Sequence, residues 1–226
     1  MPSLERDGYV ITELVLTASA CDTVARELPS AEGRRGGVRN VLTAPVVQRL
    51  LGDPRFIGEI GRFVDLPLVA VKATLFDKTP QSNWRVQWHQ DRVIAVHERI
   101  DVAGFDHWSV KDGVPHVEPP ASILERMVAV RIHLDDSGAD NGPLRVIPGS
   151  HRQGKLGEDQ IRDLVAARPQ VGLTVPQGSI LLMRPLLLHA SSQALHAGHR
   201  RVLHVELAPD GLAMPLRWHT ATPVRR

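Results

Sequence analysis

Hydrophobic spacing divides the chain into a first third with helical periodicity and a remainder with strand periodicity. Apolar residues recur at helical intervals from Thr17 to Leu28, with possible caps at Thr17 and Ser19, and this pattern predicts an amphipathic helix. A second helical stretch extends from Val46 to Phe63. The glycine-rich sequence GRRGGVRN separates the two stretches and predicts a loop.

From Leu68 onwards the chain consists of short runs rich in β-branched residues, separated by Pro, Gly and Asp, and these runs predict strands. They are LVAVKATLF, WRVQWHQ, RMVAVRIHL, LRVIP, SILLM and RRVLHVEL. Helices followed by many strands predict a mainly β fold, a sandwich or barrel with α-helices packed on one side. We expect one domain, with a helical part at 1–66, the barrel at 67–208 and a C-terminal tail at 209–226.

One segment between the predicted strands, residues 97–122, shows no sustained period. A structureless connection of that length within a compact domain is typically either disordered or an active-site lid. Trp108 and several hydrogen-bonding groups in the segment favour a lid, and a mobile surface insertion is the alternative.

Composition and charge narrow the classes of function. The chain has 27 basic and 25 acidic residues and no stripe of Lys and Arg interleaved with aromatics, so nucleic-acid binding is not indicated. A single cysteine, Cys21, cannot form an intramolecular disulfide, which fits a reducing compartment. We find no signal-peptide pattern and no apolar run long enough to cross a bilayer. These features favour a cytoplasmic protein without a nucleic-acid or membrane partner.

A set of metal-binding residue types stands at His89, Asp91 and His189. On a strand, His89 and Asp91 point to the same face while Gln90 turns away. Two imidazoles and a carboxylate on one face of a metal are the ligands of non-haem iron oxygenases, which leave positions open for co-substrate and dioxygen. Arg200 follows His189 and offers a cation for an oxo-acid co-substrate.

Two other pairs have the same spacing, His133 with Asp135 and His204 with Glu206. The first runs directly into the turn-forming sequence DDSGADNG, where its acid is expected to cap the turn or bond its backbone. His189 by itself would be better explained as a core histidine, and its position before an arginine-bearing strand turns the interpretation to the metal.

Alternation along the run RRVLHVEL predicts two faces. Leu203, Val205 and Leu207 form an apolar packing face, so the face with Arg200, His204 and Glu206 is expected to line a cofactor cavity. The opposite assignment, with Arg201 directed inward, remains an alternative.

Three motifs resemble those of the phytanoyl-CoA dioxygenase family of Fe(II)- and 2-oxoglutarate-dependent oxygenases. They are WHQD, DNGPLRVIPGSH followed by Gly154, and LLLHASS with an arginine eleven residues after its histidine. The resemblance extends from about Leu68 to Ala208 and implies a double-stranded β-helix, which is a jelly-roll, cupin-like barrel. It also implies Fe(II), 2-oxoglutarate as co-substrate, and O2.

By this resemblance His89, Asp91 and His189 would be the iron ligands, and Arg200 would pair with the distal carboxylate of 2-oxoglutarate while Ser191 hydrogen-bonds it. The carboxylate of Asp91 favours hydroxylation, because halogenating relatives have a small residue at that position. The expected activity is hydroxylation of a small organic molecule with release of succinate and CO2. No acyl-CoA signature stands out, so the family name does not give the substrate.

Substrate contacts are predicted less directly. The candidates are Trp84, Trp88, Trp108, Lys111 and Arg131. Each has an ordinary structural alternative, namely core packing, a solvated charge or an ion pair. Arg39 and Asn40 are weaker candidates for a co-substrate contact, and His151 is not assigned to the metal because three ligands already fill the site.

Two other functions compete with the oxygenase. One is a non-catalytic sensor that keeps the barrel and binds an oxo-acid or a metal, and the other is a zinc hydrolase using the same three ligands. An intact ligand set argues against the sensor. Arg200 and Ser191 argue against the hydrolase, which has no need of a dicarboxylate clamp.

Overall fold

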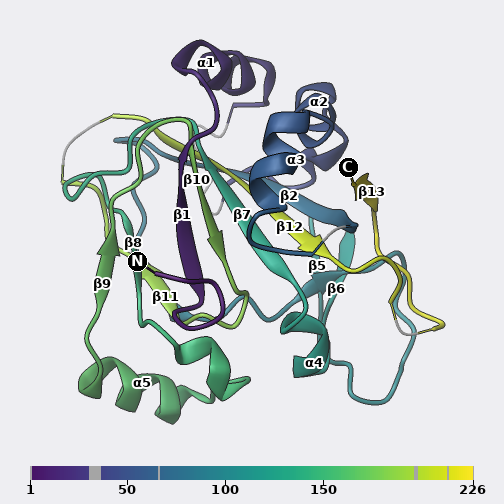
Figure 1. Ribbon diagram of the computed structural model, residues 1–226. Helices are drawn as coiled ribbons and strands as arrows, with labels where there is room; N and C mark the ends of the chain where they lie inside the picture. The colour runs from purple at the N-terminus through teal and green to yellow at the C-terminus, as the bar shows by residue number, and fades with distance from the viewer. Residues whose placement is uncertain (1, 31–36, 66, 196–197, 213, 226) are drawn as a thin grey trace.

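The computed structural model describes residues 2–30, 37–65, 67–195, 198–212 and 214–225, and its framework is a six-stranded antiparallel sheet (Figure 1). The strands in spatial order are β1 (Tyr9–Leu14), β10 (Ser179–Met183), β7 (Val128–His133), β12 (Arg200–Ala208), β2 (Leu68–Lys78) and β13 (Thr222–Val224). The six strand runs predicted from the sequence are confirmed, four of them in this sheet.

A second antiparallel sheet supplies the other wall of the barrel. Its strands in spatial order are β3 (Val86–His89), β11 (His189–Ser191), β8 (Leu144–Val146) and β9 (Val171–Leu173). One cavity is lined by β2, β7 and β12 of the main sheet and by β3, β8 and β11 of this one. The two sheets therefore enclose the cavity in the predicted double-stranded β-helix.

Helices cover the outer face of the main sheet (Figure 1). They are α1 (Ala18–Glu27), the short 3-10 turn η1 (Val41–Thr43), α2 (Pro45–Leu51) and α3 (Pro54–Ile60). Thr17 caps α1 as predicted, because its side chain accepts a hydrogen bond from the backbone N–H of Ala20 at 3.2 Å.

The stretch predicted as one helix from Val46 to Phe63 forms two helices instead. Asp53 accepts a hydrogen bond from the backbone N–H of Arg55 and caps α3, and Pro54 occupies its first turn. Proline is tolerated at the start of a helix but cannot continue one, so the chain breaks between α2 and α3.

The expectation that residues 97–122 lack structure is wrong. The segment contains β5 (Asp106–Lys111) and β6 (Val114–Glu118), which form a three-stranded sheet with β4 (Ile94–Ala95), and then α4 (Ala121–Leu124). Asp112 and Gly113 form its turn with φ of 49° and 79°, as two-residue hairpin turns require. The strands went unpredicted because β5 is largely exposed and lacks an apolar face.

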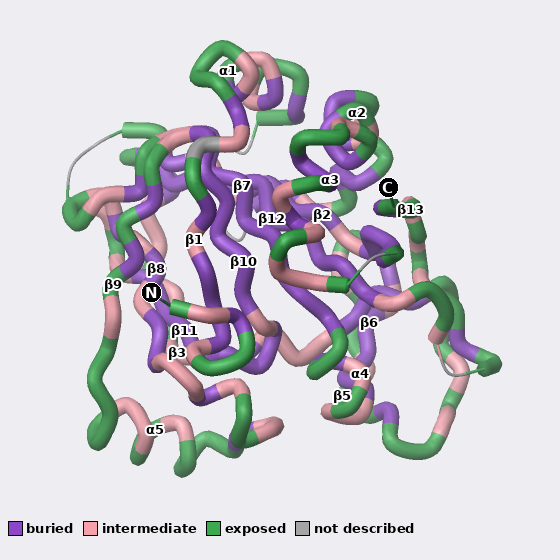
Figure 2. The backbone as a smooth tube through the Cα atoms, in the orientation of Figure 1, coloured by how far each residue is buried: buried purple, intermediate pink, exposed green. Residues whose placement is uncertain are grey.

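The predicted helical part, 1–66, and the predicted C-terminal tail, 209–226, each contain a strand. β1 lies in the region predicted as helical and pairs with β10, and β13 lies in the predicted tail and pairs with β2. Two further elements, η2 (Ser150–Gln153) and α5 (Glu158–Ala167), follow β8, and the apolar side of α5 packs beside the second sheet. In Figure 2 the buried stretches of the backbone follow the main sheet, whereas α5 is largely exposed.

Candidate active site

His89 and His189 stand opposite each other on the paired strands β3 and β11, with ring centroids 4.2 Å apart. Each Nδ1 lies 2.8 Å from the backbone carbonyl two residues earlier, that of Gln87 or of Leu187. A carbonyl only accepts, so both Nδ1 atoms carry a proton, and in the neutral imidazole this leaves a lone pair on each Nε2. These backbone contacts fix the orientation of each ring, with Nε2 available to bind a metal.

Asp91 completes the group. Its Oδ1 and Oδ2 lie 3.7 Å from His89 Nε2 and 3.8 Å from His189 Nε2. One ligand atom from each of the three residues lies within 4.8 Å of the others, which makes them a candidate metal site among the described residues. The structure therefore brings together the three residues that the sequence predicted, across one hundred positions of the chain.

Gln90 explains how His89, at the end of β3, and Asp91, just after it, are held. Its side chain points away from the site, as predicted, and is buried. Its Nε2 donates to the carbonyls of Gly154 and Leu186 at 2.8 and 2.7 Å, and its Oε1 accepts from the N–H of Leu156 at 2.9 Å. The side chain between the two ligands thus fastens them to two distant segments.

Electrostatics prepare the same residues for a cation. Burial, with the neighbouring His89, lowers the pKa of His189 to about 3, so this imidazole is neutral near pH 7. Burial opposes the charge on Asp91, but His189, His204 and His89 hold the pKa of its carboxyl below the usual range. Two imidazoles and one carboxylate fit a divalent transition metal such as Fe(II).

A second cluster lies where β12 begins. Arg200 is buried and its Nη1 donates to the carbonyl of Gly142 at 2.6 Å, while its Nε has no partner among the described residues. Lys78, its cross-strand neighbour on β2, donates to Ser191 Oγ at 3.1 Å and to the carbonyl of Ser192. Two buried cations, one hydroxyl and an unpaired guanidinium N–H fit a carboxylate.

The two consecutive arginines of β12 have opposite orientations. Arg200 lines the cavity, whereas Arg201 pairs with Asp135 at 2.6 Å, with its side chain partly exposed. Leu203, Val205 and Leu207 pack in the core. The predicted assignment of the two faces is confirmed.

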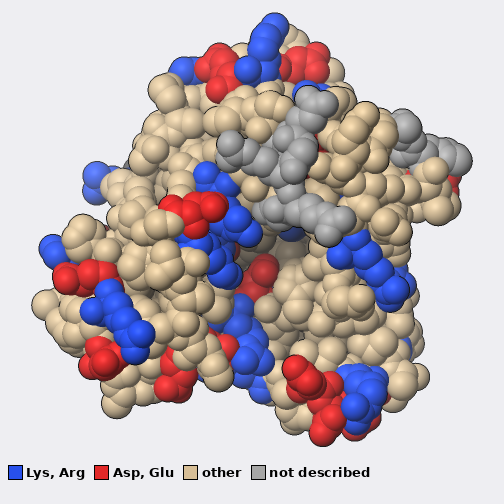
Figure 3. Space-filling view, turned by 180° about the vertical axis from the view of Figure 1, so that it is seen from behind, with Lys and Arg blue, Asp and Glu red and all other residues tan. Residues whose placement is uncertain are grey.

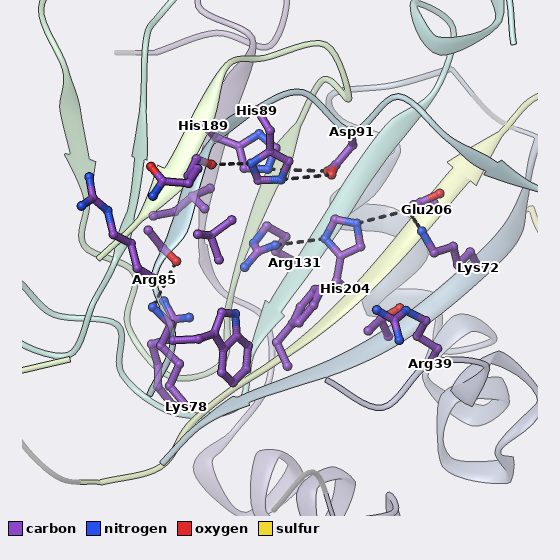
Figure 4. A pocket seen from close by; sticks show the side chains of 18 residues that line it. Arg39, Lys72, Lys78, Arg85, His89, Asp91, Arg131, His189, His204 and Glu206 are labelled. Carbon is purple, nitrogen blue, oxygen red and sulfur yellow. Dashed lines mark hydrogen bonds and ion pairs between the residues drawn. The ribbon is translucent and has the colours of Figure 1, made fainter. Parts of the chain in front are cut away.

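The cavity between the sheets has a volume of about 550 Å³. Its described lining includes six cationic side chains, Arg39, Lys72, Lys78, Arg85, Arg131 and Arg200, and two carboxylates, Asp91 and Glu206. Figure 3 shows basic side chains beside a hollow in the molecular surface, and Figure 4 shows the labelled residues converging below the histidine pair. The site is markedly basic although the whole chain is nearly neutral.

A chain of polar contacts crosses the floor of the cavity (Figure 4). Arg131 Nη1 donates to His204 Nδ1 at 3.1 Å, His204 Nε2 lies 3.6 Å from Glu206 Oε1, and Lys72 Nζ lies 2.7 Å from the same oxygen. His204 and Glu206 are therefore occupied with neighbours other than the metal-site group. His133 is buried outside that group, and His151 contacts the carbonyl of Glu5.

The five predicted substrate contacts separate into two groups. Trp84 and Arg131 line the cavity, and Trp88, Trp108 and Lys111 are not part of its lining. Trp88 precedes His89 on β3, so alternation turns it to the opposite face, where Arg145 lies over its ring.

The other two are on the β5–β6 hairpin. Trp108 lies under Arg99 and packs against the core beside that hairpin. Lys111 stands at the hairpin tip, where burial followed by the nearby Lys72 and Arg39 lowers its pKa. Arg39 lines the cavity and pairs with Asp112 at 3.2 Å, so the tip of the hairpin lies at the rim of the cavity. Asn40, the other weaker candidate, precedes η1 with a φ of 61°.

Sequence reasoning missed Lys72 and Lys78. Both lie on β2 and, with Thr74 and Phe76, line the cavity at every second position. Two lysines at even spacing in an otherwise apolar, centrally placed strand were the available signal, because a charge is buried in such a strand only when a partner or ligand compensates it.

A jelly-roll barrel that gathers two histidines and a carboxylate defines the class of candidate non-haem metal oxygenases. The profile of the phytanoyl-CoA dioxygenase (PhyH) family matches residues 4–202. The chain therefore belongs to this family of Fe(II)- and 2-oxoglutarate-dependent oxygenases.

Curated relatives include two ectoine dioxygenases. That of Sphingopyxis alaskensis is 26% identical over 174 residues, covering 66% of this chain and 48% of the relative. That of Bordetella parapertussis is 24% identical over 169 residues, covering 67% and 48% respectively. The chain spans about half the length of these relatives.

Solved structures share the fold. AviO1 from Streptomyces viridochromogenes Tue57 is 25% identical with a TM-score of 0.63, over 92% of each chain. HygX from Streptomyces hygroscopicus, with nickel and 2-oxoglutarate bound, is 18% identical with a TM-score of 0.64, over 92% of this chain and 85% of HygX. Within the described residues, no helix has the length and apolar character needed to cross a membrane.

Proposed function

We propose that the protein is an Fe(II)- and 2-oxoglutarate-dependent dioxygenase that hydroxylates a small organic molecule. The observation that carries the proposal is the convergence of His89, Asp91 and His189, with ligand atoms within 4.8 Å of one another. Family membership supports it, and so does the 2-oxoglutarate bound to HygX, a protein of the same fold.

In this proposal the two histidines and Asp91 hold Fe(II). The bound metal and 2-oxoglutarate would supply the oxidising chemistry, in which dioxygen is consumed and succinate and CO2 are released. The protein's own part is positional. The backbone carbonyls of Gln87 and Leu187 hold the Nδ1–H groups and so direct both Nε2 atoms toward the metal position, and Gln90 holds the segment that carries Asp91.

Arg200, Lys78 and Ser191 are proposed to bind the distal carboxylate of 2-oxoglutarate. The carbonyl of Gly142 takes one N–H of the Arg200 guanidinium and leaves Nε unpaired. A guanidinium with a free N–H beside a lysine and a hydroxyl recognises a carboxylate through several directional hydrogen bonds. Burial excludes water from these groups, and a hydrogen bond is stronger in such a low-dielectric environment.

The carboxylate of Asp91 supports hydroxylation as the outcome. A third protein ligand at this position leaves no vacancy for a halide on the metal. Because the two curated relatives are named ectoine dioxygenases, ectoine is the first compound to test for stimulated succinate release.

The test is an anaerobic titration of the protein with Fe(II) and 2-oxoglutarate. Its signal is the weak visible charge-transfer band that the chelate produces. We expect the band in the wild type and in Arg201→Ala, and a much weaker band in Arg200→Ala. The two variants remove the same charge from adjacent positions, one inside and one outside the cavity. A wild-type protein without the band, or equal loss in both variants, would overturn the proposal.

A further inference from the structure

Arg131 is a buried cation with no acidic partner among the described residues. Only 7% of the residue is exposed, its Nε has no hydrogen-bond partner, and it faces the cavity below the histidine pair (Figure 4). Burial lowers its pKa to about 10 against the opposing effect of Asp91, and the side chain stays charged near pH 7. Because Asp91 is assigned to the metal by the proposed function, the buried charge of Arg131 is left without an ion-pair partner of its own, which favours a further anion in the cavity.

The other charges of the cavity have identifiable partners. Glu206 pairs with Lys72 at 2.7 Å, and Arg39 pairs with Asp112 at 3.2 Å. Asp91 is assigned to the metal by the proposed function, which also assigns Arg200 and Lys78 to 2-oxoglutarate. Arg85 is exposed at the rim. Arg131 is the cation left over inside the described part of the cavity.

Arg131 is also separated from the co-substrate clamp along the strand. In the register of the main sheet it stands opposite His204, whereas Lys78 stands opposite Arg200. The four residue steps from Arg200 to His204 span about 13 Å of strand. The two arginines therefore stand at different positions along the cavity, although Arg131 is near enough to lower the pKa of Lys78 and of Arg200.

The neighbours of Arg131 hold its guanidinium in one orientation. One Nη donates to His204, which is itself placed between Arg131 and Glu206, and the guanidinium lies 5.7 Å from the Phe76 ring centroid. A guanidinium fixed on one edge and one face presents its remaining N–H groups in a set direction, as recognition of a planar anion requires.

We infer that Arg131 binds a carboxylate of the primary substrate, and thus that the enzyme oxidises a small organic acid. The inference rests on the proposed function and adds the chemical class of its substrate.

The experiment uses the full chain loaded with Zn(II), a redox-inert stand-in for the iron, together with 2-oxoglutarate. Trifluoroacetate is titrated and followed by fluorine NMR, with trifluoroacetamide as the neutral probe of similar shape. The variants are Arg131→Gln, Arg131→Lys and, as the matched control, Arg85→Gln, which removes a cation from the rim of the same cavity. The Fe(II)–2-oxoglutarate band is recorded for each variant to establish that the fold and the co-substrate site are intact.

We expect saturable binding of trifluoroacetate, but not of trifluoroacetamide, to the wild type and to Arg85→Gln. Arg131→Gln should weaken it by at least about ten-fold and Arg131→Lys by less, because lysine keeps the charge and loses the fork. Equal binding in Arg131→Gln and wild type would overturn the inference while leaving the proposed function in place. Loss of the charge-transfer band in Arg131→Gln would also overturn it, since Arg131 would then belong to the co-substrate. A wild type without the band would overturn the proposed function itself.

Discussion

His89 and His189 are cross-strand partners, one on β3 and one on β11, and their rings meet at an interplanar angle of 52°. A slip of one residue in this pairing would turn one of the two imidazoles to the opposite face of the sheet. The proposed metal site therefore depends on strand register, because the pairing of β3 with β11 brings the two histidines together.

Replacing Asp91 by Asn should abolish coupled succinate formation while leaving the fold in place. The amide has nearly the same shape as the carboxylate but no charge, so we expect metal affinity to fall by at least about 100-fold. The measurement is Fe(II) binding together with succinate release, with Asp101→Asn, an exposed acid outside the cavity, as control. Succinate formation by Asp91→Asn at the wild-type rate would exclude Asp91 as a ligand.

Lys78 should make both stability and co-substrate binding depend on pH. Burial, followed by the nearby Arg200 and Arg131, lowers its pKa from 10.5 to about 7. Between these values the unfolded chain binds the proton and the folded chain does not, so this residue makes stability rise with pH across that window. Binding of 2-oxoglutarate should weaken over the same range, because the clamp loses a charge.

The comparison is wild type against Lys78→Met. Denaturant unfolding and 2-oxoglutarate titrations are measured from about pH 6 to about pH 8.5. The variant should lack both the rise in stability and the decline in affinity that Lys78 contributes. Identical pH profiles in the two proteins would show that Lys78 does not titrate in this range.

Gly142→Ala should damage the co-substrate site without replacing any residue proposed to bind 2-oxoglutarate, although the added Cβ would also come within 3.1 Å of Lys78 Nζ. Gly142 has a φ of 69°, and an added Cβ would collide with the carbonyl of Ser192. We expect a loss of about 1–3 kcal/mol in stability and a raised KM for 2-oxoglutarate, because the carbonyl that orients Arg200 must move.

Gly138→Ala is the matched control in the same turn region. An added Cβ at Gly138 meets nothing within 4 Å. If the two alanine variants had the same KM, the carbonyl of Gly142 would have no part in holding Arg200.

Gln90→Ala should destabilise the protein and weaken metal binding together. It removes the three hydrogen bonds that the backbone groups of Gly154, Leu156 and Leu186 make with the Gln90 side chain, at a cost of about 3 kcal/mol. Thermal unfolding with and without Zn(II) measures both effects, with the exposed Gln153→Ala as control. If Gln90→Ala were destabilised but bound Zn(II) with normal affinity, Gln90 would stabilise the fold without positioning the metal site.

Much of this architecture could be read from local patterns. Alternation along β12 separated Arg200 from Arg201 correctly, because a central strand has one face on the helices and one on the cavity. The spacing of His89 and Asp91 identified a shared face for the same reason. Such inferences work where a strand has two chemically distinct sides.

Other features depend on contacts that no local pattern contains. Trp88 has the composition of a pocket residue, but its place beside a ligand on the same strand sends it to the α5 side. The hairpin over residues 97–122 is held by Glu118, which pairs with Arg92 at 2.8 Å and Lys155 at 3.0 Å. Its role as a lid remains a prediction.

The order of the main sheet has a consequence for handling the protein. β1 and β13, which come from opposite regions of the sequence, form its two borders. Open borders of a sheet recruit strands of other molecules, and a proline on the outermost strand discourages this because it has no N–H to donate. Pro223 stands on β13 in that position. Deletion of either bordering strand should therefore yield a protein that self-associates at high concentration, even where the cavity is untouched.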